Sequence, residues 1–197
     1  MRLVIQRVRR AVVRVKAGEA SPAAQVSTGE ASPAAQRSTG EASPAARMST
    51  GEASPAARPS DGDPSPAASE VAGEIGRGLL VLVGVERGDG PEAARAAAEK
   101  LAGLRVFDDE AGRMNLDAAA VGGSFLVVSQ FTLAGSVARG RRPSFDRAAP
   151  PAEAAPLVDA LVAELRRRGA TVAEGRFRAH MEVELVNDGP VTLVADF

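Results

Sequence analysis

Polar side chains that could take part in catalysis or binding lie at the end of one apolar run. The segment SQFTL, at residues 129–133, follows the run FLVV and supplies Ser129, Gln130 and Thr132. Polar residues at the end of a buried strand are where α/β proteins place binding and catalytic sites. Ordinary capping of a strand terminus explains the same pattern, so this segment alone leaves both interpretations open.

Nucleophilic catalysis by Thr132 would require an activating base. The only histidine is His180, the only lysines are Lys16 and Lys100, and none is a neighbour in sequence. A histidine without a partner motif is more often a surface or packing residue than a catalyst. The chain has no cysteine, and no cluster of histidines and carboxylates has metal-ligand spacing, so we expect neither a metal nor another cofactor.

A second polar feature is the Gly/Arg-rich loop that contains Arg139, Gly140, Arg141 and Arg142. Such a loop can contact phosphate, or it can be a solvated basic loop without a ligand. Arginine far outnumbers lysine throughout the chain, and the net charge is only −1, so arginine content alone does not indicate a nucleic-acid partner.

The stretch LVNDGPVTLV, at residues 185–194, combines strand-like runs with turn residues. Asn187, Asp188 and Gly189 predict a tight turn, yet Pro190 follows where a strand would donate an N–H, which proline lacks. The stretch is therefore either an unusual hairpin or a rigid projection.

Periodicity predicts a mixed, β-rich α/β fold with two main helices. Residues 2–8 and 11–15 alternate like paired strands, and residues 70–75, 79–85 and 124–128 also predict strands. One helix is predicted from Pro91, with Asp89 near its N-cap, and another around residues 157–165. Three strands close the chain, around residues 170–177, 181–186 and 191–196. We expect a single domain over residues 1–197.

A repeat interrupts this domain at residues 18–70. The unit GEASPAA recurs with a period of eleven residues, and each copy carries proline but no large apolar stripe. This composition favours a disordered low-complexity insertion at the tip of an N-terminal hairpin, with a solenoid as the alternative. The longest apolar run, residues 79–85, is too short to span a membrane, and no secretory signal is visible, so we expect a cytoplasmic protein.

Five short segments together resemble one family, the D-aminoacyl-tRNA deacylases. They are IQRV at residues 5–8, MNL at 114–116, SQFTL at 129–133, RPSF at 142–145 and NDGPVT at 187–192. The resemblance covers nearly all of the chain outside residues 17–70, and the repeat is its departure from the family pattern.

The resemblance implies a homodimer in which each subunit completes the other's site. Gly189 and Pro190 of one subunit, joined by a cis peptide bond, would enter the partner's pocket around Ser129, Gln130, Phe131 and Thr132. Arg7 and Asn187 would support that projection. Main-chain groups of SQFTL and the 2′-hydroxyl of the terminal adenosine would perform catalysis, without a side-chain nucleophile.

The expected activity is hydrolysis of the ester that joins a D-amino acid, or glycine, to the 3′ end of tRNA. Aminoacyl-tRNA and a second copy of the chain are the expected partners, and neither membrane nor DNA is expected. A related deacylase that edits a small L-amino acid, or a non-catalytic tRNA-binding module, are the alternatives.

Overall fold

The structure, a computed structural model, describes residues 1–16 and 69–197. The predicted repeat insertion lies outside the described residues, except that Ser69 and Glu70 belong to a strand. Lys16 pairs with Ser69, so the segment between them connects two adjacent strand ends, as the hairpin prediction requires.

One long strand, β1, organises the sheet. β3 pairs antiparallel with its first half and β2 with its second half, while β8 runs antiparallel along its other edge. β6 is parallel to β3, and β7 is parallel to β6. The strands are β1 (Arg2–Lys16), β2 (Ser69–Ile75), β3 (Gly78–Gly84), β6 (Ser124–Ser129), β7 (Val172–Glu174) and β8 (Met181–Asp196), and a separate hairpin contains β4 (Phe107–Asp108) and β5 (Met114–Leu116).

Two predicted strand boundaries are wrong. Residues 2–8 and 11–15 do not pair with each other but form the continuous strand β1, because β8 holds the backbone extended through the exposed Arg9 and Arg10. Residues 181–186 and 191–196 are likewise two parts of β8, both paired with β1. The turn residues between them form a bulge in one strand, so the hairpin interpretation of residues 185–194 is wrong.

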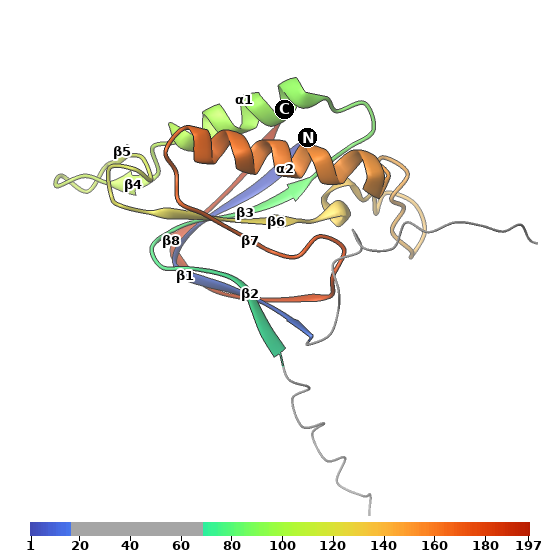
Figure 1. The fold of residues 1–197 in the computed structure, drawn as a ribbon, viewed down its shortest axis with the longest axis horizontal. Helices are drawn as coiled ribbons and strands as arrows, with labels where there is room; N and C mark the ends of the chain where they lie inside the picture. The colour runs from blue at the N-terminus through green and yellow to red at the C-terminus, as the bar shows by residue number, and fades with distance from the viewer. Residues whose placement is uncertain (17–68) are drawn as a thin grey trace, which may run out of the picture.

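Two helices, α1 (Pro91–Ala102) and α2 (Pro151–Arg167), lie side by side over one face of the sheet (Figure 1). Both were predicted, and both have proline in the first turn, where its missing N–H has no helical partner. Asp89 lies directly before the N-cap, Gly90, as predicted, but its carboxylate does not cap the helix and accepts a hydrogen bond from the Met1 ammonium instead.

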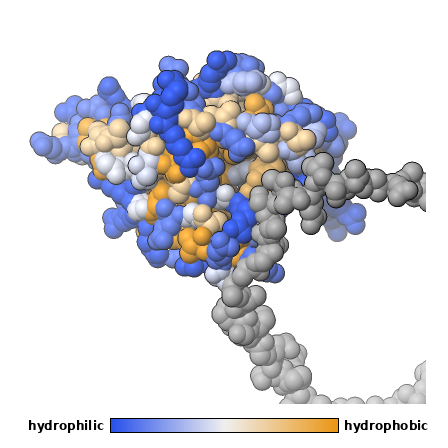
Figure 2. Space-filling view, viewed as in Figure 1, coloured by the Kyte–Doolittle hydropathy of each residue, from blue (hydrophilic) through white to orange (hydrophobic). Residues whose placement is uncertain are grey.

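The sheet separates two apolar cores. One packs between the helices and β1, β3 and β6, and the other lies on the opposite face, where the sheet curls toward a barrel. Gly73 of β2 allows β7 to approach closely, because a Cβ at this position would clash with the Glu174 carbonyl oxygen of β7 at 2.3 Å. Hydrophilic residues dominate the rim of the face shown in Figure 2, and apolar residues surface across its middle.

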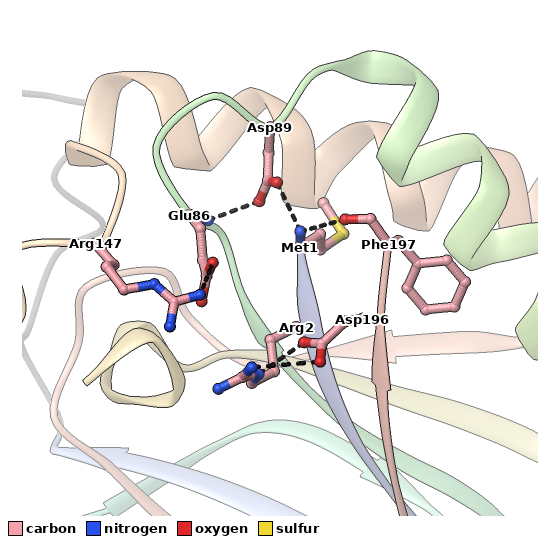
Figure 3. Close-up of polar contacts among 7 residues, drawn as sticks. All are labelled: Met1, Arg2, Glu86, Asp89, Arg147, Asp196 and Phe197. Atoms are coloured by element: carbon pink, nitrogen blue, oxygen red, sulfur yellow. Dashed lines mark hydrogen bonds and ion pairs between the residues drawn. The ribbon is translucent and has the colours of Figure 1, made fainter. Parts of the chain in front are cut away.

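The two ends of the chain are joined beside the start of α1 (Figure 3). The buried Met1 ammonium donates to the Asp89 carboxylate at 2.6 Å and to the Phe197 carbonyl at 2.7 Å. Next to it, the partly buried Arg2 donates to Asp196, and this bond holds the pKa of Asp196 below its ordinary value. These contacts hold the start of β1 against the end of β8.

Among the described residues, no helix is long and apolar enough to cross a membrane.

Candidate active site

The SQFTL segment begins where the parallel pair of β3 and β6 ends. The Gln130 amide donates to the Val83 carbonyl at 2.7 Å, which extends the pairing by one bond. The chain then turns into the 3₁₀ helix η2 (Phe131–Ala134). Gly84 makes room for this turn, because a Cβ there would lie 2.8 Å from the Leu133 Cβ. The segment is thus seated on the end of β3.

A cavity of about 560 Å³ borders this segment. Three kinds of wall surround it: the end of β6 with Ser129, Gln130 and Phe131, the chain entering α2, and the loop from β7 into β8. Thr132 does not line the cavity, although it accepts a hydrogen bond from the Gln130 side chain. The structure therefore brings three of the four predicted SQFTL residues to one apolar pocket.

The third wall, formed by Phe177, Arg178, Ala179 and His180, was not predicted. His180 had been interpreted as a surface or packing residue, and it is exposed, but it lies at the rim of this pocket. No spacing pattern links residues 177–180 to SQFTL, and the rarity of histidine in this chain is the only sequence signal that marks them.

The segment offers two main-chain donors. The first N–H groups of a helical turn have no partner within the helix. In the described part of the chain, the amides of Phe131 and Thr132 donate to no acceptor, whereas those of Gln130, Leu133 and Gly135 do. Two adjacent unpartnered N–H groups are the arrangement that stabilises a developing oxyanion in acyl-transfer enzymes.

The NDGPVT segment projects from β8 as a bulge opposite Arg7. Gln6 pairs with Thr192 and Val8 with Asn187, which leaves residues 188–191 outside the ladder. Asn187 closes the base of the bulge by donating from Nδ2 to the Thr192 hydroxyl at 3.1 Å. Gly189 and Pro190 at its tip are exposed and joined by a cis peptide bond, the conformation that the family resemblance implies.

Arg7 lies beneath this bulge and is only 6% exposed. Its Nε donates to the Asp188 carbonyl at 3.1 Å, and its Nη1 donates to the Val106 carbonyl at 2.6 Å. The carboxylates of Asp108 and Asp188 lie 3.4 and 3.6 Å from the guanidinium and balance its buried charge. Arg7 therefore ties the bulge to the chain that precedes β4.

Gly189 cannot be replaced without strain. Its φ is +122°, and a Cβ at this position would lie 2.9 Å from the Val191 side chain and 3.0 Å from the Arg7 guanidinium. Both the backbone conformation and the space therefore require glycine.

The pocket and the bulge are far apart within one chain. Gly84, which touches the SQFTL segment, pairs with Arg2, whereas the bulge stands opposite Arg7 on the same strand. At ~3.3 Å per residue of strand, these two points of β1 are separated by roughly 16 Å.

Known proteins resemble the chain in sequence and in fold. Residues 66–196 match the family model described as D-Tyr-tRNA(Tyr) deacylase. A D-aminoacyl-tRNA deacylase of Heliobacterium modesticaldum is 62% identical over 128 residues, which are 65% of this chain and 85% of the relative. The D-aminoacyl-tRNA deacylase of Geobacter sulfurreducens is 59% identical over 124 residues, covering 63% of this chain and 82% of that one.

Two solved structures have a similar fold. A structure named c-Myc DNA Unwinding Element Binding Protein superimposes with a TM-score of 0.69 and 27% identity, covering 100% of this chain and 99% of that chain. A probable eukaryotic D-amino acid tRNA deacylase superimposes with a TM-score of 0.66 at 15% identity, covering 100% and 98%, and shows the fold alone. With the family model matching residues 66–196 and relatives at about 60% identity, the chain belongs to the D-Tyr-tRNA(Tyr) deacylase family.

Proposed function

We propose that this protein hydrolyses the ester bond of D-aminoacyl-tRNA and releases free tRNA and the D-amino acid. The family and its named relatives support the reaction class. The observation on this chain that carries the proposal is the pair of unpartnered amides, Phe131 and Thr132, at the edge of an apolar pocket. In the cytoplasm, where aminoacyl-tRNA is used, this activity is chiral proofreading in translation.

The proposed chemistry relies on main-chain groups. Water attacks the ester carbonyl, the carbonyl oxygen becomes an oxyanion, and the amides of Phe131 and Thr132 donate hydrogen bonds to it. Collapse of this intermediate expels the 3′-oxygen of the terminal ribose, which leaves protonated as the free hydroxyl. Removing one such donor from an acyl-transfer enzyme lowers kcat by roughly 10²–10³.

Thr132 acts in this scheme through its amide rather than its hydroxyl. A threonine nucleophile needs a base within about 3 Å, and its hydroxyl instead accepts a hydrogen bond from the neutral Gln130 amide. Ser129 and Gln130 shape the pocket and hold the turn.

Selection between D and L substrates belongs, in this proposal, to Gly189 and Pro190 of a second subunit. The two residues project outward on a bulge supported by Arg7 and Asn187, and roughly 16 Å of β1 separates them from their own pocket. A partner's bulge can enter a pocket that the chain's own bulge cannot reach. Main-chain atoms there would exclude an L side chain and admit a D side chain or the hydrogen of glycine.

The surface of β8 supports a homodimer. Within the described part of the chain, β8 pairs only with β1, so its other edge is open, and such edges are usually covered. Four apolar side chains of β8 are also exposed: Val183, Val186, Leu193 and Val194. A symmetric pair would cover this strand and place each bulge near the other subunit.

The deciding experiment follows ester loss from one tRNA charged with D- or L-tyrosine, with glycyl-tRNA as a third substrate. We expect rapid loss of the D-ester and of the glycyl ester, and background loss of the L-ester. Equal rates on the D- and L-esters, or loss of the L-ester alone, would identify an L-editing enzyme or an unselective one. Binding without hydrolysis would identify a tRNA-binding module.

Mixed dimers test the exchange between subunits. A variant with a defective bulge, Gly189→Val, should hydrolyse D- and L-esters without preference, and one with a defective donor, Phe131→Pro, should be nearly inactive. After mixing and subunit exchange, one site per heterodimer combines the intact pocket of one chain with the intact bulge of the other, and a preference for the D-ester should return. If mixing restores no preference while exchange is verified, pocket and bulge act within one chain.

A further inference from the structure

The loop at residues 135–146 has a defined shape although it lies outside the regular elements. Ser136 and Ser144 exchange two backbone hydrogen bonds of 2.8 and 2.9 Å, which close the loop at its base. Gly140 at its tip has a φ of +69°, as a tight reversal requires. The side chains of Arg139, Arg141 and Arg142 are all exposed around this tip.

The base of the loop is fixed to the candidate active site. The Phe145 ring meets the Phe131 ring edge to face, with 5.1 Å between centroids. Gly135 permits this contact, because a Cβ there would lie 2.9 Å from the Phe145 ring. On the other side, the Arg87 guanidinium donates to the Asp146 carbonyl at 3.0 Å. The loop therefore keeps its position relative to the pocket edge at Phe131.

The three arginines of this loop lack the ion pairs that many other arginines of the described residues form. On the sheet and on α2, arginines form ion pairs with nearby carboxylates. In the described structure, Arg139, Arg141 and Arg142 take part in no ion pair or hydrogen bond with the protein. Arginine abundance in this chain carries no argument by itself, but around one tip the three guanidinium groups carry positive charges that form no ion pair in the described structure.

We propose that this loop binds phosphates of the tRNA substrate, next to the 3′ end that occupies the pocket. The inference rests on the proposed function, which places the terminal adenosine beside Phe131. From Phe145 to Arg142 the chain spans at most ~10 Å, and from Gly135, which also contacts Phe145, to Arg139 at most ~14 Å, so the three guanidinium groups reach the phosphates adjoining that adenosine and the end of the acceptor stem. Arginine is suited to this contact, because its planar group donates two hydrogen bonds to one phosphate.

These contacts predict a specific kinetic signature. On a single strand such as the 3′ end of tRNA, each phosphate contact contributes ~0.7 to the slope of log affinity against log salt concentration. Three contacts therefore account for about a 20-fold change in tRNA affinity between 50 and 200 mM salt. They act on any tRNA, because the backbone carries no sequence information.

The test replaces all three arginines by glutamine, Arg139→Gln, Arg141→Gln and Arg142→Gln together. The matched control replaces three exposed basic residues that form no ion pair in the described structure, Arg95, Lys100 and Arg113, so net charge changes equally. Deacylation is measured on D-tyrosyl-tRNA and on 3′-D-tyrosyl adenosine, which has no phosphate, and binding of uncharged tRNA is measured by fluorescence anisotropy.

For the loop variant we expect KM on D-tyrosyl-tRNA to rise at least tenfold at 50 mM salt, with kcat unchanged and a shallower salt dependence. Its activity on 3′-D-tyrosyl adenosine should equal that of the wild type, and the control should match the wild type on both substrates. A loop variant that binds uncharged tRNA as the control does would overturn the proposal. Equal losses on both substrates would also overturn it, because they would place the effect in the pocket.

Failure of the proposed function is distinguishable from these results. If the wild type hydrolyses neither substrate, the deacylase proposal fails. Even then, loss of uncharged-tRNA binding in the loop variant but not in the control would establish the phosphate site. If the wild type preferred duplex DNA over tRNA, the proposal that the loop binds tRNA would be refuted.

Discussion

Replacing Phe131 by proline removes one of the two proposed oxyanion donors without adding a bulky group. Phe131 is the first residue of η2, and the preceding Gln130, with φ −142° and ψ 81°, lies outside the helical region that a following proline disfavours, so proline is tolerated at this position. The substitution also removes the phenyl ring, which is 56% exposed and touches Phe145. Phe131→Ala removes the ring but keeps the N–H and is therefore the matched control.

The two variants separate the two contributions. Loss of an edge-to-face aromatic contact is worth ~0.5–1.5 kcal/mol, so Phe131→Ala should keep kcat on D-tyrosyl-tRNA within about tenfold of the wild type. Loss of an oxyanion donor is worth ~2.7–4 kcal/mol, so Phe131→Pro should lower kcat by a further 10²–10³-fold. Single-turnover rates, with circular dichroism and sedimentation to establish fold and dimer, provide the measurement. Equal rates for the two folded variants would refute the main-chain mechanism.

Four further changes test the structure in different ways. Thr132→Val removes the hydroxyl but keeps the amide, so single-turnover deacylation should stay within about tenfold of the wild type, whereas a nucleophile would lose several orders of magnitude. Gly189→Ala should lower the free energy of unfolding in urea by ~1–3 kcal/mol, more than Gly112→Ala, because both glycines have positive φ but only Gly189 lacks space. Asp89→Asn leaves the buried N-terminal ammonium without its ion pair and should cost ~3–5 kcal/mol in the same assay. Arg167 and Arg168 lower the pKa of Glu164 to about 2. The ionised Glu164 therefore stabilises the fold fully above pH 4.5, and this stabilisation is lost as the pH falls toward 2. Glu164→Gln should make the melting temperature depend less on pH across that range.

Each of these four results has an outcome that contradicts its reasoning. An inactive but folded Thr132→Val variant would make the hydroxyl catalytic. Equal destabilisation by the two glycine substitutions would show that the contacts around Gly189 relax without cost. A stable Asp89→Asn variant would mean that the Phe197 carbonyl alone holds the ammonium. An unchanged acid profile for Glu164→Gln would show that solvent screens its two arginine partners.

The sequence predicted the position of SQFTL at the end of a strand because a local signal marks it. A buried apolar run that stops at polar residues predicts a strand end, and the structure has β6 ending at Ser129. The same kind of signal predicted α1 and α2, whose apolar faces recur at helical spacing. These predictions succeeded because each depends on a few neighbouring residues.

The pairing around NDGPVT was not predictable, because it depends on residues far away in the sequence. Asn187, Asp188 and Gly189 are turn formers, and within residues 185–194 nothing reveals that both flanking runs pair with the same strand, β1. The buried Arg7 that supports the bulge is equally invisible, since IQRV alone does not distinguish a buried arginine from an exposed one. Residues 177–180 join the pocket only through the path of the chain from β7 to β8. Contacts between residues far apart in the sequence determine all three features: the bulge, the burial of Arg7 and the place of residues 177–180 in the pocket.

β1 sets the distance between the two halves of the proposed site. Its Arg2 end adjoins SQFTL and its Arg7 position carries the bulge, and an extended strand paired on both edges cannot shorten. In the proposed symmetric dimer one rotation would relate both contacts, so each bulge would reach the partner's pocket simultaneously or neither would. Two complete sites would therefore form in one association step, and an isolated subunit would retain the proposed oxyanion donors without the partner's bulge. Dilution that dissociates the dimer should consequently remove the preference for D substrates along with the fraction of dimer, rather than leave a selective monomer.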